Sequence, residues 1–369
     1  MTNYITLSSN GLRLFCHELF ESYGFSPEDA AVIADVILTA DLQGVESHGV
    51  NRLIRYHKEL LSGFVDVNAK AEIVLETPVS AVIDARKSMG QTVAVFAMDK
   101  AIEKAKKTGV GMVSVRNSNH FGIAGYYTAR AVKAGFIGFC TTNTEAICAP
   151  TFSKKAMLGT NPIAFAMPAV PVPFSFDAAT SAVPLGKLEV YRKNNEPLPE
   201  NWAVDENGNP TRDAASVIKA IEQKTYGGIL PLGGGNGASN PGGHKGYGLA
   251  VIADICAGIL SGGVTSNHIN VKPGETGICH YFSAVDYGVF GDKKELETAV
   301  SRFLAELRAA PPASGCRRVY THGEKEAETM ARRVKEGVPV NVETCAEIGR
   351  IAREQGVVFD VSRLSAPAV

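Results

Sequence analysis

The sequence predicts a protein that mixes helices with β-strands, in which a helical unit precedes a sheet-containing domain. From Leu12 to about Ser62 the apolar residues recur at the three- and four-residue spacing of amphipathic helices. From about Ala71 they form short runs typical of strands, with helical segments between them. The chain has 369 residues, of which 45% are hydrophobic, so it can form two or three domains with a large core.

Three helices are expected in the first 70 residues. Gly24, Gly44 and Gly63 each follow a segment of helical periodicity, where a left-handed residue commonly ends a helix. Ser26 and Pro27 predict the start of the second helix. A serine oxygen can accept from the free N–H groups of the first turn, and proline there has a preset φ.

The third helix carries the first candidate functional residues. It is predicted to begin near His48, with Ser47 as its cap. On a helix His48 and Arg52 would share one face, because residues four apart are neighbours. The apolar residues of the segment lie on another face, so this polar pair predicts a site for a small acid.

The second zone predicts a sheet and the last zone predicts further helices. Strands are expected at residues 72–76, 80–85, 111–116, 135–142 and 162–169, and helices at residues 92–107, 123–134 and 249–260. Three charged helices near Lys293, Glu324 and Glu343 close the chain. We therefore expect a helical domain of residues 1–70, packed with residues 293–369, and a sheet domain of residues 71–292.

Composition excludes several classes of protein. The formal net charge is −1 and no run of lysine or arginine forms a basic stripe, so neither nucleic acid nor an anionic membrane is an expected partner. The N-terminal residues lack the pattern of a signal peptide, and the most apolar stretch, residues 248–260, is short and contains Asp254. The seven cysteines are odd in number and never form CxxC, which favours free thiols and a cytoplasmic protein.

One short motif resembles the dinucleotide fingerprint of a Rossmann fold. GGGNGA at residues 233–238 fits GxGxxA and follows an apolar run. The third position should open a helix that holds a pyrophosphate, but Ser239, Asn240 and Pro241 follow instead. We therefore interpret the segment as a loop and do not expect a Rossmann fold.

Other segments place polar residues where α/β proteins commonly bind ligands. His120 follows a predicted strand and precedes a helix, in the segment NSNHFGIAGYY. Lys245 lies between glycines at the start of a predicted helix, where an ammonium and free N–H groups could bind a phosphate. GTNPIAFAMP from Gly159 and DAATS from Asp177 are two further candidates.

Six segments in a fixed order resemble a known family. They are ESHGVNR, NSNHFGIAGYY, GTNPIAFAMP, DAATS, LPLGG with GGHKGYGLA, and GICHYFSAVD. Together they resemble the malate/L-lactate dehydrogenase family, which lacks the Rossmann fold and includes L-sulfolactate, ureidoglycolate and diketogulonate enzymes. The resemblance covers nearly the whole chain. It departs from the family at residues 322–324, which read HGE in place of PGE, and at the longer loop of residues 233–241.

The resemblance implies a non-Rossmann fold and a dinucleotide cofactor. A helical domain would lie beside a larger, mostly antiparallel sheet domain that binds NAD, with NADP as the alternative. A homodimer would share its active site across the interface. The implied cofactor contacts are His120, Asp177, Ala178, Ala179, Thr180, Ser181, His244, Lys245, Gly246, Gly323 and Glu324.

The resemblance also implies the substrate site and the reaction, an interconversion of a small 2-hydroxy acid and its 2-oxo acid by hydride transfer. The implied substrate contacts are Ser47, Arg52, Thr160 and Asn161, and the implied catalytic residues are His48, His120 and Arg52. A histidine, with an ordinary pKa of about 6.5, suits the proton exchanged with the substrate oxygen. We favour His48 slightly over His120 as proton donor, because its spacing to Arg52 suits one substrate.

Three alternatives remain open at this point. The chain could be a dimer that binds dinucleotide without turnover, or a related reductase of imines or of the ureidoglycolate type. A metal-dependent hydrolase using His48, His120, His244 and His280 is disfavoured, because no pair of them has the spacing of metal ligands. No metal is expected.

Overall fold

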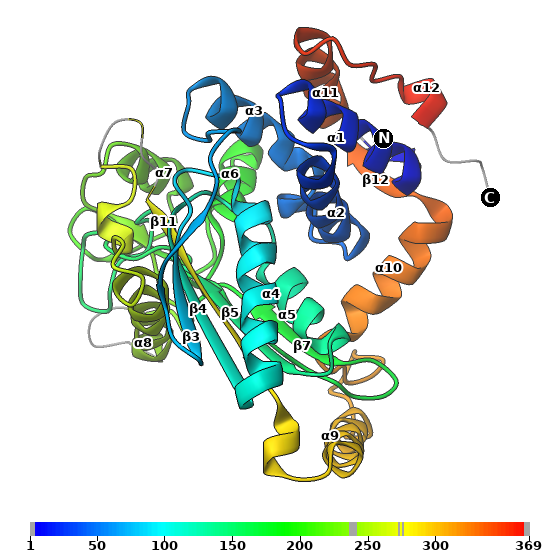
Figure 1. Ribbon diagram of the computed structural model, residues 1–369. Coiled ribbons are helices and arrows are strands. Elements are labelled where there is room, and N and C mark those ends of the chain that lie inside the picture. Colours follow the sequence, from blue (N-terminus) through cyan, green and yellow to red (C-terminus); the bar gives the residue numbers. More distant parts are fainter. Residues whose placement is uncertain (1–3, 236–241, 272–273, 275–276, 365–369) are drawn as a thin grey trace.

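The computed structural model describes residues 4–235, 242–271, 274 and 277–364. A central sheet carries helices on both faces, and a helical unit lies at one side of it (Figure 1). The helices are α1 (Ser9–Ser22), α2 (Pro27–Leu42), α3 (Leu53–Leu61), α4 (Gly90–Thr108), α5 (Ala124–Lys133), α6 (Leu185–Asn194), α7 (Ala214–Glu222), α8 (Gly243–Asp254), α9 (Lys293–Arg308), α10 (Glu324–Glu336), α11 (Val342–Glu354) and α12 (Val361–Leu364). The strands are β1 (Tyr4–Leu7), β2 (Glu72–Glu76), β3 (Ser80–Asp84), β4 (Val110–Ser118), β5 (Ile137–Thr142), β6 (Ile163–Met167), β7 (Phe174–Ala178), β8 (Ala203–Val204), β9 (Pro210–Thr211), β10 (Gly228–Ile229), β11 (Ile278–Val285) and β12 (Val338–Asn341).

The central sheet has seven strands in the order β2-β3-β4-β11-β5-β6-β7. Only β3 and β4 pair in parallel, and the other neighbours are antiparallel. The parallel pair is joined by α4, as expected, because parallel strands need a long crossover. The sheet is therefore mostly antiparallel, unlike the parallel sheet of a Rossmann fold.

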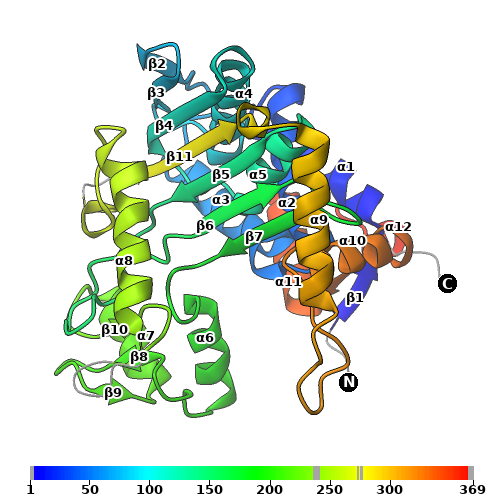
Figure 2. The same cartoon turned by 90° about the horizontal axis from the view of Figure 1, so that it is seen from below.

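Helices cover the two faces of this sheet in different ways. α4 and α5 pack on one face, and α8 crosses the other (Figures 1 and 2). Val113 and Val115 are buried in the core that includes α4 and α5, whereas the Ser114 hydroxyl between them donates to the Cys256 carbonyl beyond α8. This alternation follows from the two-residue period of a strand. Gly111 lets α4 approach closely, because a Cβ there would lie 1.9 Å from the Ala101 carbonyl.

The helical unit is built from both ends of the chain. One apolar core contains buried residues of α1, α2 and α3 together with residues of β12 and α11. β1 pairs with β12, so that Tyr4 lies opposite Asn341. α9 contributes nothing to this core and lies near β7 at the edge of the sheet (Figure 2). The division of the chain near residue 70 stays a prediction, and we would group α9 with the sheet.

The expected signals at the ends of the first helices are confirmed. The Ser26 hydroxyl accepts from the Asp29 N–H at the start of α2, and Pro27 occupies its first position. Gly24 and Gly44 have φ of +98° and +85°, which is the left-handed region that ends a helix. These ends are determined by local sequence, which explains why they could be located in advance.

The third helix begins later than expected. Two 3-10 turns, Glu46–His48 and Val50–Arg52, precede α3, and the extended Gly49 separates them. Ser47 caps no helix. His48 and Arg52 therefore do not lie on one face of a single helix, which corrects that expectation.

Some helices and strands were not predicted from the sequence, and others begin or end at different residues than predicted. The helix expected at residues 249–260 begins at Gly243 and changes at Ile255–Ile259 into a π-helical turn. A small sheet of β10, β8 and β9 packs with α6 and α7, and each of its strands has only two residues, too few to show a period. In the loop of residues 233–241, residues 236–241 lie outside the described part of the chain. Of the helices that are described, none is long and apolar enough to cross a membrane.

Candidate active site

The turn that carries His48 is held by a buried carboxylate. Asp41, at the end of α2, accepts from the Val50 N–H at 2.8 Å and is 2% exposed. A Cβ on Gly49 would lie 1.8 Å from the Asp41 Oδ1, so only glycine fits between the two turns. Arg333 of α10 donates to the Asp41 carbonyl and to Glu46, each at 2.6 Å. The turn is thus fixed between α2 and α10.

Two histidines from distant segments stack at this turn. The rings of His48 and His120 are 5.5 Å apart between centroids and inclined by 28°. His48 Nδ1 lies 3.0 Å from the Ser47 hydroxyl. Burial, together with the charges of Arg52 and Arg55, lowers the pKa of His48 to about 4. His48 is therefore neutral at neutral pH.

His120 has a second, buried partner. Its Nδ1 lies 2.7 Å from the hydroxyl of Tyr56, which is 1% exposed, and 3.4 Å from the Gly122 N–H. Burial lowers the pKa of His120 well below its ordinary value, and the charges of Arg55, His48 and Arg52 add to this effect. Tyr56 thus orients one nitrogen of the ring and leaves Nε2 for another partner.

Arg52 reaches the same corner by a different route from the one expected. Its Nε donates to the Ser47 carbonyl at 2.5 Å, so the side chain folds back along the turn. Burial and the neighbouring Arg55 lower the pKa of Arg52. A turn and not a helix therefore brings Arg52 close to His48, and a joint role of the two side chains stays a prediction.

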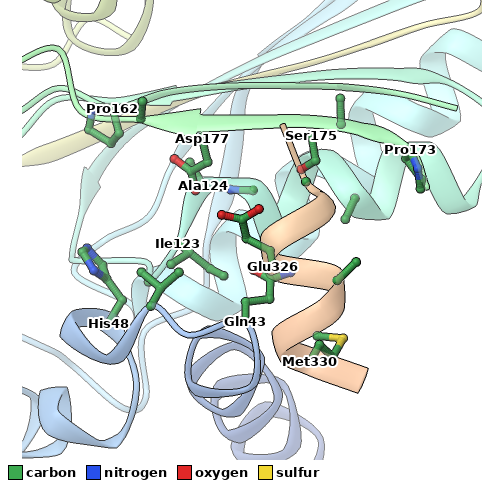
Figure 3. A pocket seen from close by; sticks show the side chains of 18 of the residues that line it. Gln43, His48, Ile123, Ala124, Pro162, Pro173, Ser175, Asp177, Glu326 and Met330 are labelled. Atoms are coloured by element: carbon green, nitrogen blue, oxygen red, sulfur yellow. Dashed lines mark hydrogen bonds between the residues drawn. The ribbon is translucent and has the colours of Figure 1, made fainter. Parts of the chain in front are cut away.

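A groove of about 520 Å³ leads away from His48. One wall is formed by β7 and the start of α5, and the opposite wall by the end of α2 and by α10 (Figure 3). The groove runs from His48 and Pro162 at one end to Pro173 and Met330 at the other (Figure 3). Most of its lining is apolar, so it suits a long ligand with flat rings.

Two carboxylates face each other in the middle of this groove. Asp177 of β7 accepts from the Gly125 N–H at 2.7 Å, at the free N-terminus of α5. Asp177 is open to the groove but recessed between its walls, and this desolvation raises its pKa to about 6, with Glu326 adding to the shift. Figure 3 shows Asp177 and Glu326 pointing into the space between β7 and α10. Such a pair can accept hydrogen bonds from sugar hydroxyls.

Comparison with known proteins decides the family. The model of the malate/L-lactate dehydrogenase family matches residues 7–349. The chain belongs to the malate/L-lactate dehydrogenase family.

Individual members of the family agree with this assignment. The chain is 42% identical to a malate dehydrogenase of Pyrococcus abyssi, over 96% of each chain. It is 31% identical to the ureidoglycolate dehydrogenase (NAD(+)) of Escherichia coli, over 88% of this chain and 90% of that one. The crystal structure of a malate dehydrogenase from Entamoeba histolytica superposes with a TM-score of 0.92 at 34% identity, covering 96% of this chain and 99% of that chain.

Several residues that are expected to contact the cofactor do line the groove. They are Asp177, Ala178, Ala179 and Gly323. Thr160 and Ser47, proposed for the substrate, line it as well. His120 stacks on His48 but does not itself line the groove.

Three other residues expected to contact a ligand instead form hydrogen bonds within the protein. Asn161 is fully buried, and its amide donates to the Ala250 carbonyl and to Asp254. Thr180 donates to the Thr160 carbonyl, and Ser181 to the Val183 carbonyl. These three side chains face the interior of the protein, and their contact with a ligand stays a prediction.

Two further segments with expected cofactor contacts, Glu324 and residues 244–246, also do not line the groove. Glu324 is 7% exposed and accepts from the Thr321 N–H at 2.6 Å, so it closes the start of α10 and does not line the groove. His244 and Lys245 lie exposed at the start of α8, and Gly246 packs on the backbone of Leu232. Within the described residues these three do not line the groove of their own chain.

Sequence reasoning missed Tyr56 and Glu326. Tyr56 follows Arg52 by four residues, and that spacing was a usable signal. Gly323, Glu326 and Met330 also recur at helical spacing along one wall of the groove.

The four histidines considered for a metal do not converge. Both ring nitrogens of His280 lie 2.8 Å from hydroxyls, those of Thr142 and Ser118. His244 is exposed on α8, apart from the stacked pair of His48 and His120. In the described part of the chain no three His, Cys, Asp or Glu side chains are arranged to hold a metal ion.

Proposed function

We propose that this protein binds NAD(H) in the groove and interconverts a small 2-hydroxy acid and its 2-oxo acid. The observation that carries the proposal is the position of the two histidines and Arg52 at the end of a long groove. Membership of the family supports the reaction class. NAD is favoured over NADP because a relative is named as an NAD(+) enzyme and because two carboxylates face the groove.

The residues of the groove fit a dinucleotide. Its volume lies in the range of cofactor sites, and its apolar walls can pack against flat rings. Asp177 and Glu326 would accept hydrogen bonds from ribose hydroxyls. Ala178, Ala179 and Thr160 line the end nearest His48 and would surround the nicotinamide. The bound cofactor supplies the hydride, and the protein supplies orientation and proton exchange.

The geometry supports separate roles for the polar residues of this corner. Arg52 would hold the carboxylate of the acid with its guanidinium fork, which fixes the reacting carbon in place. His120 would exchange a proton with the substrate oxygen through Nε2, because Tyr56 occupies its other nitrogen. This reverses the slight preference for His48, whose Nδ1 partner is the exposed Ser47 hydroxyl. His48 would pack against His120 and bound substrate.

Charge explains how such a buried histidine could acquire a proton. Burial, together with the charges of Arg55, His48 and Arg52, keeps the pKa of His120 low. A substrate carboxylate bound at Arg52 would offset this positive charge and favour the imidazolium. Protonation would then accompany binding of the acid, so the donor is charged only when a substrate is present.

We further propose that the protein is a homodimer with a shared active site. Leu249, Ile252, Ile255 and Ile259 form an exposed apolar stripe along α8 and the following turn. A second copy packed there would bury this stripe and bring the exposed His244 and Lys245 toward the partner. All seven cysteines are free, which supports a reducing compartment such as the cytoplasm.

The test is NADH oxidation with a panel of 2-oxo acids, followed by absorbance. Oxaloacetate, pyruvate and glyoxylate are compared with a cyclic imine acid, and NADPH is tested in parallel. His120→Asn should slow single-turnover hydride transfer by about a hundredfold or more, and His48→Asn by less. Binding of NADH without its oxidation in the presence of any of these acids would instead support the non-catalytic alternative.

A further inference from the structure

A residue with an unusual backbone conformation separates two residues that line the groove. Thr160 and Pro162 both line it, and Pro162 lies at its His48 end (Figure 3). Asn161 between them is 0% exposed and has a φ of +34°, in the left-handed region that residues other than glycine seldom adopt. Such a conformation persists only where the surrounding structure enforces it, and it is concentrated at functional sites. The contacts that hold Asn161 therefore also decide how its two neighbours face the groove.

The side-chain amide of Asn161 holds this segment in place. Its Nδ2 donates to the Asp254 carboxylate and to the Ala250 carbonyl, both on α8 and each at 3.0 Å. Its Oδ1 accepts from the Thr144 N–H at 3.0 Å. These contacts fix which end of the amide faces α8, because the Thr144 N–H requires an oxygen. The backbone beside the groove is thereby tied to α8.

Asp254, the last residue of α8, is a buried carboxylate whose two oxygens both accept hydrogen bonds. It is 5% exposed. Oδ2 accepts from Asn161, and Oδ1 accepts from the Ser266 N–H at 2.9 Å and from the Asn143 amide at 3.2 Å. Burial raises the pKa of Asp254, whereas these hydrogen bonds lower it. A carboxylate can accept at both oxygens, and an amide cannot.

The chain changes its helical form directly after Asp254. A π-helical turn, Ile255–Ile259, begins there, and turns of this kind are rare and frequently occur at functional sites. Gly258 lets the turn pack closely, because a Cβ there would lie 2.6 Å from the Val264 carbonyl oxygen and 3.1 Å from the Asn143 amide nitrogen. That amide also donates to the Val264 carbonyl at 2.8 Å. The partners of Asp254 are thus themselves held in position.

We propose that Asp254 is a positioning residue for the nicotinamide end of the dinucleotide. Its carboxylate holds the Asn161 amide, the amide holds the left-handed backbone, and this backbone presents Thr160 and Pro162 to the groove. Asp254 does not line the groove, so it acts on a ligand through Asn161. The inference rests on the proposed function, which supplies the ligand and its orientation in the groove.

Asp254→Asn tests this role, because the new side chain has only one acceptor oxygen. If that oxygen stays with Ser266 and Asn143, the new NH2 group faces the NH2 group of Asn161 and this hydrogen bond is lost. Asn161 cannot turn its own amide over, because its Nδ2 would then face the Thr144 N–H. The opposite orientation of the new amide would lose the bonds from both Ser266 and Asn143. The bond to Asn161 is therefore the one expected to break.

Amide hydrogen exchange measures the loss without any cofactor. The Thr144 N–H donates to Asn161 Oδ1, and the Thr180 N–H donates to the Thr160 carbonyl at 2.8 Å. Both amides should exchange about tenfold faster in Asp254→Asn, because the segment that accepts from them is less firmly held. Amides that pair β11 with β4 should exchange as slowly as in the wild type.

Two ligands locate the effect within the groove. NADH carries the nicotinamide ring and ADP-ribose lacks it. In Asp254→Asn the Kd of NADH should rise about tenfold, whereas the Kd of ADP-ribose should stay within about twofold. Single-turnover hydride transfer should also slow by about tenfold, because the ring is less well oriented. A general loss of structure would weaken the binding of both ligands.

Two further variants complete the experiment. Lys104→Met removes the hydrogen bonds of a buried ammonium group to Glu76 and to the Thr77 carbonyl, away from the groove, and should leave both Kd values unchanged. Asn161→Gly tolerates the left-handed backbone but removes the amide, so it should weaken NADH as Asp254→Asn does. Adding Asp254→Asn to Asn161→Gly should weaken NADH no further, since the two residues act in one chain.

The outcomes separate this inference from the proposed function. Unchanged NADH affinity in Asn161→Gly or Asp254→Asn, an equal loss of ADP-ribose affinity, or additive effects in the double variant would overturn the role of Asp254. A wild-type protein that binds neither ligand would contradict only the proposed function. Exchange of the Thr144 and Thr180 amides would then still decide whether Asp254 holds the segment.

Discussion

At the residue scale, the site depends on which side chains burial brings together. His48, Arg52 and His120 could be predicted from the sequence, because their residue types suit the chemistry and the family resemblance includes them. Tyr56 and His120 are 64 residues apart, so their contact of 2.7 Å is a property of the fold. The sequence likewise does not show that the Asn161 amide donates to the Ala250 carbonyl and to Asp254, which are about 90 residues away.

Asp41 gives a prediction about pH. Burial raises its pKa from 3.8 to about 7. Since the folded-state value is the higher one, its contribution to the free energy of unfolding is present below about pH 4 and is lost as pH rises to about 7. The loss should amount to up to roughly 4 kcal/mol, at 1.36 kcal/mol per unit. Urea denaturation across this range should show the loss in the wild type.

Asp41→Asn is the control for this prediction. The amide oxygen can still accept from the Val50 N–H, but it does not titrate. The variant should lack this pH-dependent loss and be relatively more stable at the upper end of the range. If the free energy of unfolding changes with pH in the same way in the wild type and in Asp41→Asn, then Asp41 is not the group that titrates.

At the element scale, local signals located helices better than turns. Ser26, Pro27 and Gly24 act within a few residues, and the structure confirms them. The interruption at Gly49 has a distant cause, the Asp41 carboxylate that occupies the space of a side chain. Helical spacing between His48 and Arg52 could not reveal it.

Gly49→Ala tests this account of the turn. The added Cβ would meet Asp41, so the turn must shift and the free energy of unfolding should fall by about 1–3 kcal/mol. Because His48 lies in this turn, kcat/KM should fall as well. Denaturation and steady-state kinetics check the two effects together.

A second glycine serves as the matched control. Gly349 lies inside α11, where a Cβ would meet only the Arg353 and Phe359 side chains at 3.7 Å. Gly349→Ala should therefore stabilise the protein by about 0.5–1 kcal/mol, as alanine does in a helix. Equal losses of stability in Gly49→Ala and Gly349→Ala would mean that the contact of the added Cβ with Asp41 does not cause the loss.

At the scale of the whole molecule, the two ends of the chain support the active site jointly. β12 and α11 complete the core of α1, α2 and α3, and β1 pairs with β12. α10 forms a wall of the groove and also holds the His48 turn through Arg333. A substitution that destabilises the C-terminal segment should therefore also affect the turn that carries His48.

Ile348→Ala tests this connection. Ile348 is 0% exposed in α11, and truncation should lower the free energy of unfolding by about 2–5 kcal/mol. Val342→Ala in the same helix should cost little, because Val342 is 45% exposed. Hydrogen exchange should show faster opening of α1 and α2 in Ile348→Ala only. Faster exchange confined to α11 would contradict a shared core.

The sequence by itself determined the mixed fold class, most strands of the main sheet, the ends of the first helices and the family. These features depend on periodicity, caps and ordered motifs, which act over short stretches of chain. Only the tertiary structure decided that Tyr56 fixes His120, that Glu326 and not Glu324 faces the groove, and that Gly49 interrupts the His48 turn. The first two depend on contacts between segments far apart in the chain, and the third on how the end of α2 packs against the turn that follows it. Local periodicity and caps carry no record of these contacts.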